Sequence, residues 1–329
     1  MQKETHSFLL MLTQTYWSDG MSYAPIIIFV YNRADHFTEV YNALSACEEA
    51  KDSDLFIFSD GAKNDAGKDK VNEVRAAVAA IKDSGDFRSV TVTESPVNKG
   101  LAASVISGVT EVINKYGKVI VVEDDCKVSP FFLSFMNSAL DYYETNKKIG
   151  SIAGYAPVID FPDYYNKDVF AAHRSCSWTW ATWKDRWDGV DWELKEMKDF
   201  YSSPRLIRRL NSNGSDRFIR LYRQTKGNGS SWSVRFGAHL VKNNLLTVYP
   251  RLSYAQNIGC DESGVHSTSD DAAKMRVDLS KAIENPVLTD VDIDKKIQKK
   301  LKKHYSYGFV SEAKKLVATV LILLKERLS

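Results

Sequence analysis

The chain has 329 residues, of which 44% are hydrophobic and 12% aromatic, enough apolar material for one large α/β domain or two smaller ones. The 44 Lys and Arg nearly balance the 42 Asp and Glu, so the net charge of +2 does not support a nucleic-acid-binding surface. The 4 cysteines include no CxxC pair, which argues against a zinc site of familiar spacing and favours reduced thiols in a cytosolic protein.

The first segment, residues 1–22, contains an apolar run only from Phe8 to Leu12. That run is too short for the core of a signal peptide, and polar residues flank it. We expect a disordered leader here, with Met21 as an alternative start. No later apolar stretch is long enough to span a bilayer.

From Pro25 onward, strand patterns alternate with helix patterns. The segment "PIIIFVYNRADHFTEVYNAL" predicts a buried strand, Ile26 to Val30, and then a helix capped near Asp35. The same alternation continues with a strand at 55–58, a helix at about 69–82, a strand at 90–93, a helix after Gly100 and the strand "KVIVVE". Such βαβ units predict an α/β fold with a mostly parallel sheet covered on both faces.

Beyond Pro130 the alternation weakens, and a tryptophan-rich stretch follows the helix pattern "FFLSFMNSALDYYETN". Tryptophans at these spacings usually belong to a core, so we expect at most one or two to line an acceptor cleft. The five residues are Trp178, Trp180, Trp183, Trp187 and Trp192. With no internal repeat, one compact domain with a C-terminal appendage is the preferred organisation.

The tail, residues 295–329, is rich in lysine and contains the helix pattern "SEAKKLVATVLILLKERL", which is strongly apolar from Leu316 to Leu324. Two interpretations are open. The helix either docks on the core of the domain or rests as a basic amphipathic helix on an anionic membrane surface.

Three carboxylates, Glu123, Asp124 and Asp125, follow the buried strand "VIVV" directly. In an open parallel sheet the carboxyl ends of the strands share one edge, where ligands bind. Asp124 and Asp125 would offer hard oxygen ligands to Mg²⁺ or Mn²⁺, an ion that could neutralise charge on a departing nucleoside diphosphate. The alternative is a solvated turn in which Asp125 caps a helix starting near Pro130. The loops after Val30 and Phe58 also carry polar groups, which favours the metal site.

Five motifs in order carry a resemblance to a known family: "VYNRAD", "FSDGAK", "NKGLAASV", "VVEDD" and "NIGCDESGVHS". From Pro25 to about His266 the chain resembles nucleotide-sugar glycosyltransferases of the GT-A fold, of the bacterial polysaccharide type. It is more distantly similar to the animal N-acetylglucosaminyltransferase I group, which carries an EDD form of the DxD motif. The resemblance implies a GT-A domain at 23–270, with a nucleotide-sugar half at about 23–130 and an acceptor half at about 131–270. A basic helical appendage, 271–329, would follow.

The resemblance also implies roles for polar residues in the first half of the domain. Arg33 would contact the diphosphate, and Asp60 would accept a hydrogen bond from the uracil imide. Lys99 would reach a phosphate or a sugar hydroxyl. The alternatives for Arg33 and Asp60 are a surface arginine and a turn-forming Asp-Gly pair.

Around the carboxylates, the resemblance places Glu123 and Asp124 on the ribose or the donor sugar and makes Asp125 the most direct metal ligand. His266 lies in a polar, glycine-containing loop that could close over the donor diphosphate. Its alternative is a plain surface histidine.

The general base of an inverting transferase is normally an Asp or Glu near the acceptor hydroxyl. The segment that corresponds to its position in the animal enzymes, "SSWSVRFGAHL", has Ser233 and no carboxylate. Asp216 is the first candidate, because it begins a predicted helix after a Gly-Ser turn. The other candidates are Asp191, Glu193, Asp261 and Glu262. A retaining mechanism without a protein base is also open.

The sequence thus predicts a metal-dependent hexosyl- or N-acetylhexosaminyltransferase that uses a UDP-sugar and Mn²⁺ or Mg²⁺. Its acceptor would be a glycan or lipid-linked glycan in surface polysaccharide synthesis. The expected location is the cytoplasm, peripheral to the inner face of the membrane, with no nucleic-acid partner. The alternatives are a sugar-1-phosphate nucleotidyltransferase, whose Gly-rich loop "VYNRADHF" lacks, and a non-catalytic scaffold in which Ser233 marks a lost base.

Overall fold

A computed structural model of the chain describes residues 23–259, 275–306 and 308–328. Its strands are β1 (Ile26–Val30), β2 (Asp54–Ser59), β3 (Ser89–Glu94), β4 (Lys118–Glu123), β5 (Cys126–Val128), β6 (Ile149–Ala153), β7 (Val169–Ala172), β8 (Thr179–Trp183), β9 (Leu246–Pro250) and β10 (Ala255–Asn257). Its α-helices are α2 (Ala34–Ser45), α3 (Lys68–Ile81), α4 (Leu101–Tyr116), α5 (Phe132–Tyr143), α6 (Lys184–Trp187), α7 (Met197–Ser202), α8 (Pro204–Leu210), α9 (Arg217–Thr225), α10 (Trp232–Lys242), α12 (Lys295–His304) and α13 (Phe309–Leu328).

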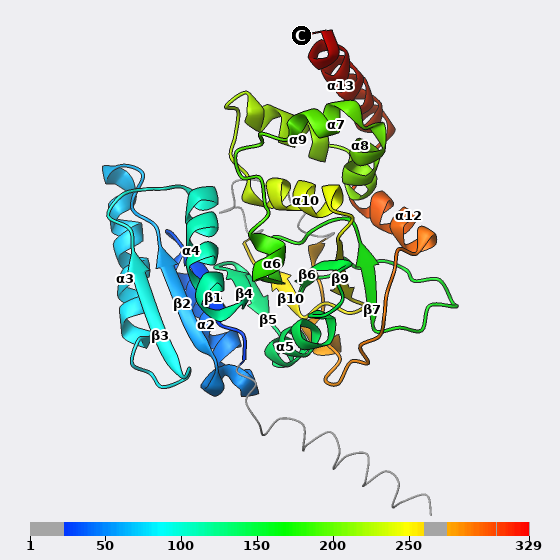
Figure 1. Ribbon diagram of the computed structural model, residues 1–329. Helices are drawn as coiled ribbons and strands as arrows, with labels where there is room; N and C mark the ends of the chain where they lie inside the picture. The colour runs from blue at the N-terminus through cyan, green and yellow to red at the C-terminus, as the bar shows by residue number, and fades with distance from the viewer. Residues whose placement is uncertain (1–22, 260–274, 307, 329) are drawn as a thin grey trace, which may run out of the picture.

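One sheet organises the molecule, with eight strands in the order β3-β2-β1-β4-β8-β6-β9-β7. Strands β3, β2, β1 and β4 run parallel to one another. Strand β8 lies antiparallel between β4 and β6, while β9 is parallel to β6 and antiparallel to β7. The predicted fold class is confirmed: an α/β fold with a mostly parallel sheet flanked by helices (Figure 1).

The buried strand β1 shows why both faces of this sheet are covered. Successive residues of a strand point to opposite faces. Ile26 and Ile28 therefore pack in one cluster with Phe37 of α2, whereas Ile27 packs in a second cluster with Val105 of α4. A continuous run of apolar residues is what a strand buried on both sides requires.

The two ends of α4 are set by glycines. Gly100 precedes the helix with φ +78°, and Gly117 ends it in the left-handed conformation at the same φ. Glycine adopts this backbone region without the steric cost that a Cβ brings. The helix consequently starts and stops where the sequence predicts it.

A helical part formed by α7, α8, α9 and α10 stands beyond one side of the sheet, and α13 lies against it (Figure 1). Its core is a separate apolar cluster that contains Phe218, Leu221 and Val241, with Ile322 and Leu323 of α13 packed on it. The segment before α13 packs against a different core. Residues from Val277 to Tyr305 supply Ala282, Ile297 and Leu301 to the main core, so this stretch packs with the sheet. The domain boundaries stay predictions.

The tryptophan-rich stretch is mostly core, as predicted. Trp180, Trp183 and Trp187 are each at most 2% exposed. Trp180 stacks on Trp187 and Trp232, with ring centroids 5.7 and 4.8 Å apart. These rings fill the space between the sheet and α10, and they join the helical part to the sheet.

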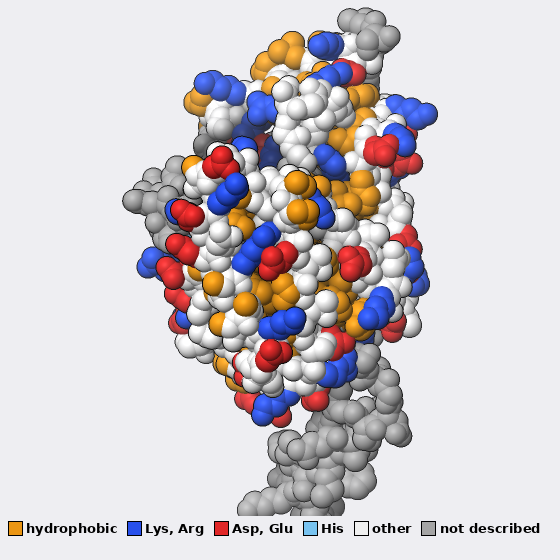
Figure 2. Space-filling model, turned by 90° about the vertical axis from the view of Figure 1, so that its left-hand side faces the viewer, with side chains coloured by type: hydrophobic (Ala, Val, Ile, Leu, Met, Phe, Trp, Pro, Cys, Tyr) orange, Lys and Arg blue, Asp and Glu red, His pale blue; other side chains and the backbone are white. Residues whose placement is uncertain are grey.

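The surface carries charges of both signs. Figure 2 shows Lys and Arg side chains interspersed with Asp and Glu over the face that includes α3 and β3. Within the residues that the structure describes, no helix has both the length and the hydropathy needed to cross a membrane.

Candidate active site

The candidate site lies where the strand order of the sheet reverses. From β1 the chain proceeds to β2 and β3 on one side, and it then returns to place β4 on the other side of β1. The carboxyl ends of β1 and β4 lie side by side, with Phe29 opposite Glu123. The turns that follow these two strands lie at the position where open α/β sheets generally bind ligands, and we refer to it as the crevice position.

One arginine and two aspartates form a charge cluster at this point. The Nη2 atom of Arg33 lies 2.8 Å from Oδ1 of Asp124 and 3.0 Å from Oδ2 of Asp125. The side chain of Arg33 is 25% exposed, and those of the aspartates are 9% and 12% exposed. The guanidinium therefore stands between the two carboxylates and makes charge-assisted contacts with both. The predicted convergence of the strand end after Val30 with the strand end after Val122 is confirmed.

The charge cluster carries more negative than positive charge. Burial raises the pKa of Asp124 to about 6, and the negative charge of Asp125 adds to this although Arg33 opposes it. Burial also raises the pKa of Glu123 well above its usual range, and both neighbouring aspartates raise it further. A further positive charge at this position would relieve that repulsion.

Strand β10 holds Asp125 from the opposite side. The amide nitrogen of Asn257 donates to Oδ1 of Asp125 at 3.0 Å, and the backbone N–H of Ile258 donates to the carbonyl of Asp125 at 2.8 Å. A Cβ at Gly259 would stand 2.4 Å from Oδ2 of Asp125 and 2.7 Å from Nη1 of Arg33, so these groups would have to shift. Asn257 and Gly259 are site residues that the sequence reasoning left without a role. The signal that could have found them is their place in the "NIGCDESGVHS" motif.

The alternative interpretation of Asp125 as a helix cap is wrong. Strand β5 follows it directly, and α5 begins only at Phe132. The residue before that helix, Phe131, makes no side-chain cap, and Asp125 takes no part there. The aspartate is instead used at the crevice position, between Arg33 and Asn257.

Asp60 holds the loop that leads into α4. Its Oδ1 accepts hydrogen bonds from the backbone of Gly61 at 2.9 Å and of Lys99 at 2.8 Å. Its Oδ2 accepts from the backbone of Gly100 at 2.9 Å and from the side chain of Asn98 at 3.2 Å. A carboxylate has about four acceptor positions, and these four donors occupy them. The role of Asp60 toward uracil stays a prediction, and it requires the loop to release one of these contacts.

The other candidates lie apart from the charge cluster or outside the described residues. Lys99 has an exposed side chain on the loop that Asp60 holds. Asp216 precedes α9, is 34% exposed and lies 3.9 Å from Arg220. In the part of the chain that the structure describes, neither side chain has a recorded contact with Arg33 or the two aspartates. His266 lies outside the described residues, as do the candidate bases Asp261 and Glu262.

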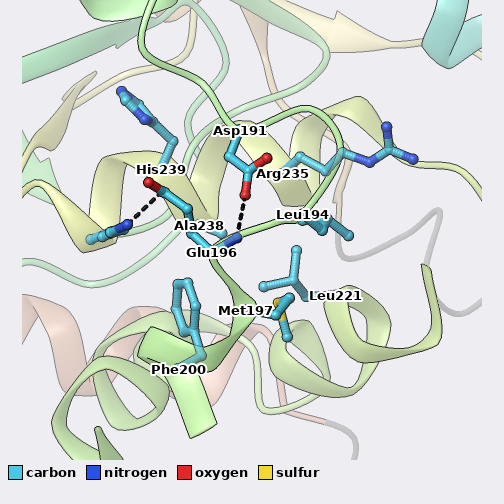
Figure 3. A pocket seen from close by; sticks show the side chains of 10 residues that line it. Asp191, Leu194, Glu196, Met197, Phe200, Leu221, Arg235, Ala238 and His239 are labelled. Carbon is cyan, nitrogen blue, oxygen red and sulfur yellow. Dashed lines mark hydrogen bonds and ion pairs between the residues drawn. The ribbon is translucent and has the colours of Figure 1, made fainter. Parts of the chain in front are cut away.

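One of the two remaining candidate bases, Asp191, borders a hollow among α7, α9 and α10, shown in Figure 3. Asp191 accepts a hydrogen bond from the backbone of Glu196 at 2.8 Å, so it stabilises the turn into α7. Glu193 is exposed and pairs with Lys195. Ser233, in the segment that lacks a carboxylate, lies on α10 and contacts Ser231 at 3.2 Å. These contacts do not identify which residue is the general base.

A comparison with known protein families matches the part of the chain that contains the charge cluster. The profile of the GNT-I family matches residues 7–157, a range that contains β1, β4 and the whole charge cluster. Over these residues the chain is similar to the GNT-I family. The predicted resemblance to this group of GT-A nucleotide-sugar glycosyltransferases is confirmed there, and it supports a glycosyltransferase-like enzyme. No curated protein sequence is similar enough to the chain to count as a match.

Several solved structures are similar to the chain at very low sequence identity. S. aureus TarS is 11% identical with a TM-score of 0.44, and the match covers 76% of this chain and 37% of TarS. The mannosyltransferase PcManGT from Pyrobaculum calidifontis, solved with GDP-Man and Mn²⁺, is 13% identical with a TM-score of 0.36, covering 72% of this chain and 76% of its own. A UDP-glucose pyrophosphorylase in complex with UDP-glucose is 10% identical with a TM-score of 0.38, covering 72% and 94%. The chain thus spans little more than a third of the length of TarS. With TM-scores below 0.5, these structural similarities do not establish an activity.

Proposed function

We propose that the chain is a metal-dependent glycosyltransferase that moves a hexosyl or N-acetylhexosaminyl group from a nucleotide-diphosphate donor, in the first place a UDP-sugar. The acceptor is a glycan or a lipid-linked glycan in surface polysaccharide synthesis. The observation that carries this proposal is the meeting of Arg33, Asp124 and Asp125 where the strand order reverses. A guanidinium suits a phosphate group, and two carboxylates suit a hard cation, so together they could bind the diphosphate of a nucleotide sugar and its metal ion.

Asp124 and Asp125 are the residues that would hold Mn²⁺ or Mg²⁺. Their oxygens are hard ligands, and they already converge on a positive group in the form of Arg33, so the donor set fits such an ion. Among the described residues no group of three or more His, Cys, Asp or Glu side chains meets in a metal-binding arrangement. Water and phosphate oxygens would therefore complete the coordination. When bound, the ion supplies positive charge that balances the departing nucleoside diphosphate.

Arg33 is proposed to bind the donor diphosphate. Its planar guanidinium matches two phosphate oxygens as well as it matches the two carboxylates that it now contacts. Its side chain is 25% exposed, so it can turn toward a ligand at the crevice position without unfolding the turn after β1. Glu123 lies beside it and is proposed to contact the ribose or donor sugar with Asp124.

Residues farther from the charge cluster complete the proposed site. Asp60 would contact uracil while it holds the loop before α4, and the exposed Lys99 on that loop would reach a phosphate or sugar hydroxyl. His266 would close over the diphosphate. Asp216 is proposed as the general base, because its ion pair with Arg220 is long at 3.9 Å and leaves its carboxylate able to accept a proton.

We further propose a cytoplasmic location, peripheral to the inner face of the membrane, where a lipid-linked glycan would be available. The exposed lysines of α12 support this location, because basic segments are attracted to anionic lipid surfaces. The near balance of charges in the whole chain supports no nucleic-acid partner.

The test is the release of UDP from a panel of UDP-sugars with Mn²⁺, for the native chain, for Asp125→Ala and for Asp65→Ala. Asp65 is a matched control, because its carboxylate is exposed and pairs only with Lys68 in the described contacts. We expect Asp125→Ala to lower the rate by about 100-fold or more, the scale seen when a positioning group is lost, and Asp65→Ala to leave it unchanged. Activity that survives both Asp125→Ala and chelation of the metal would contradict the mechanism.

Two other outcomes would assign the crevice position to a different function. Release of pyrophosphate from UTP and a sugar phosphate would identify a nucleotidyltransferase. Tight binding of UDP without turnover on any acceptor would identify a scaffold that binds nucleotide sugars. Thermal shift with UDP measures this binding directly, since a ligand at a hundredfold excess over its dissociation constant stabilises the native state by about 2.7 kcal/mol.

A further inference from the structure

Helix α13 turns both of its glutamates toward the protein. Glu312 accepts a hydrogen bond from Ser215 at 2.8 Å. Near the other end, Glu326 accepts one from Tyr222 at 2.9 Å and pairs with Lys226 at 3.1 Å. Between them Thr319 is 7% exposed. The face of α13 that rests on α7 and α9 is therefore held by hydrogen bonds and ion pairs at both ends.

The opposite face of α13 is apolar and exposed. We name it the outer stripe; it consists of Leu316, Val317, Val320, Leu321 and Leu324, which are 47% to 66% exposed. Phe309 and Val310, in the first turn, are 88% and 66% exposed. A helix on the surface of a globular protein in water normally has its apolar side chains inward and its charges outward. An exposed apolar face of this size on the surface marks a site of interaction.

The exposed charges that the described part of α13 itself carries have one sign. Lys314 and Lys325 are the charged residues of α13 that the structure describes as exposed, while Glu312 and Glu326 are turned inward. The preceding helix α12 joins α13 through residues 305–308 and adds a further set of exposed lysines. These are Lys295, Lys296, Lys299, Lys300, Lys302 and Lys303. The partner of the outer stripe must therefore offer both apolar surface and negative charge.

This charge pattern distinguishes between two occupants. A second copy of the chain could cover the outer stripe with its own stripe, but it would bring Lys314 and Lys325 against lysines of the same sign. The described outer face of α13 has no carboxylate to balance them. An anionic bilayer offers acyl chains to the apolar side chains and phosphate groups to the lysines.

We propose that the outer stripe of α13 is a membrane-docking surface that lies in the headgroup region of an anionic bilayer. The lysines at its two ends and those of α12 contact lipid phosphates. The docked face of α13 stays on α7 and α9, so the helix lies along the membrane surface. The proposal names the surface behind the proposed peripheral location, and it does not depend on the sugar-transfer reaction.

The test is sedimentation of the full-length chain with vesicles of phosphatidylcholine, with and without phosphatidylglycerol. We expect binding to the anionic vesicles that weakens as salt is added, because exposed charges are screened. The variant V317Q/L321Q should bind at least about tenfold more weakly, since two apolar side chains no longer enter the lipid. The matched control is V158Q/V287Q, which changes two valines that are 66% and 65% exposed outside α13.

Three results would overturn the proposal. These are equal binding of the native chain to neutral and anionic vesicles, unchanged binding of V317Q/L321Q, and a concentration-dependent dimer that V317Q/L321Q abolishes. UDP release with a soluble acceptor is measured on the same variants without lipid. A failure of the docking proposal with UDP release intact is thereby distinguished from a failure of the proposed function.

Discussion

The charge cluster and the outer stripe of α13 differ in which of their side chains are exposed to water and which are paired within the protein. At the cluster, Arg33, Asp124 and Asp125 are largely withdrawn from water and paired with one another, yet the carboxyl groups outnumber the guanidinium. On α13 the polar groups are paired against the protein, and apolar side chains are left in water. Among the described residues, the cluster thus has fewer positive than negative groups, and the stripe has no apolar cover.

Because of this difference, we expect mutations at the charge cluster to have larger effects than mutations on the outer stripe. Buried, paired groups at a rigid sheet edge leave little room for displacement, so small changes there should have large effects. Exposed side chains on one face of a helix make few contacts within the chain, so changes there should leave the stability of the protein almost unchanged.

The strongest test of this contrast is G259A. A Cβ at this position would stand 2.4 Å from Oδ2 of Asp125, so the carboxylate and Arg33 must move. We expect UDP release to fall by about 100-fold, because a displacement of roughly 1 Å at a reacting site can cost that much. The free energy of unfolding should fall as well, since the new Cβ would also stand 2.9 Å from Cβ of Asp125, which cannot move without its backbone.

The matched control for G259A is G67A. A Cβ at Gly67 would meet its nearest atom, on Asn64, at 3.5 Å, which is ordinary contact. Its backbone, with φ −91°, is open to alanine. Full activity of G259A would show that the charge cluster tolerates displacement and that the close approach of Gly259 has no functional meaning.

A second large effect is expected for Asp60→Asn. Asparagine keeps one acceptor oxygen and brings an NH₂ group toward backbone N–H donors that Asp60 now accepts, at Lys99 and Gly100. Buried donors left without an acceptor cost about 1–3 kcal/mol. Urea denaturation should show a loss of that size, whereas Asp65→Asn, on an exposed side chain, should show none. Equal stability of the two variants would mean that the loop before α4 is held by other contacts.

The half of the molecule around the charge cluster could be predicted from the sequence to a large extent. Strand β1 and α2 follow from local periodicity, and the predicted strand Ile26 to Val30 agrees with the observed one. That Arg33 meets Asp124 and Asp125 follows from a general rule, because parallel strands bring their carboxyl ends to one edge. Here local pattern and topology point to the same result.

Other parts could not be predicted because long-range pairing decides them. Asn257 reaches Asp125 only because β10 pairs with β5, a register that no local periodicity specifies. The antiparallel insertion of β8 between β4 and β6 is of the same kind. Asp60 looks like an ordinary turn residue in sequence, and its role in holding the loop depends on residues 38 to 40 positions away.

A pH-dependent prediction contrasts the two edges of the sheet. At the opposite edge, Asp54 begins β2, and hydrogen bonds from Arg88 lower its pKa to about 2 although burial opposes this. A carboxylate with a lowered folded-state pKa contributes stability above its unfolded pKa, near 4, and loses it as the pH falls toward 2. At the charge cluster burial instead raises the pKa of Asp124 to about 6, although Arg33 opposes this.

We therefore expect Asp54→Asn to lower the free energy of unfolding by about 1 kcal/mol at neutral pH, an estimate that allows for the partly exposed Arg88. Denaturation between pH 7 and pH 3 should show a constant difference from the native chain above about pH 5 and a narrowing difference below about pH 4. A difference that did not change with pH would show that the ion pair is not the source of the effect.

The smallest effect is expected on α13, where two neighbouring residues face opposite ways. Leu321 is 60% exposed in the outer stripe, whereas Ile322 packs on the core of the helical part. In solution without lipid, L321Q should change the free energy of unfolding by less than about 0.5 kcal/mol, since glutamine and leucine have similar helix propensities and few contacts are lost. I322Q should cost about 1–3 kcal/mol, because a polar amide enters an apolar contact. If L321Q lowered the free energy of unfolding as much as I322Q, the outer stripe would already be covered in solution. The contrast between a buried charge cluster and an exposed helix face would then be wrong for the helix.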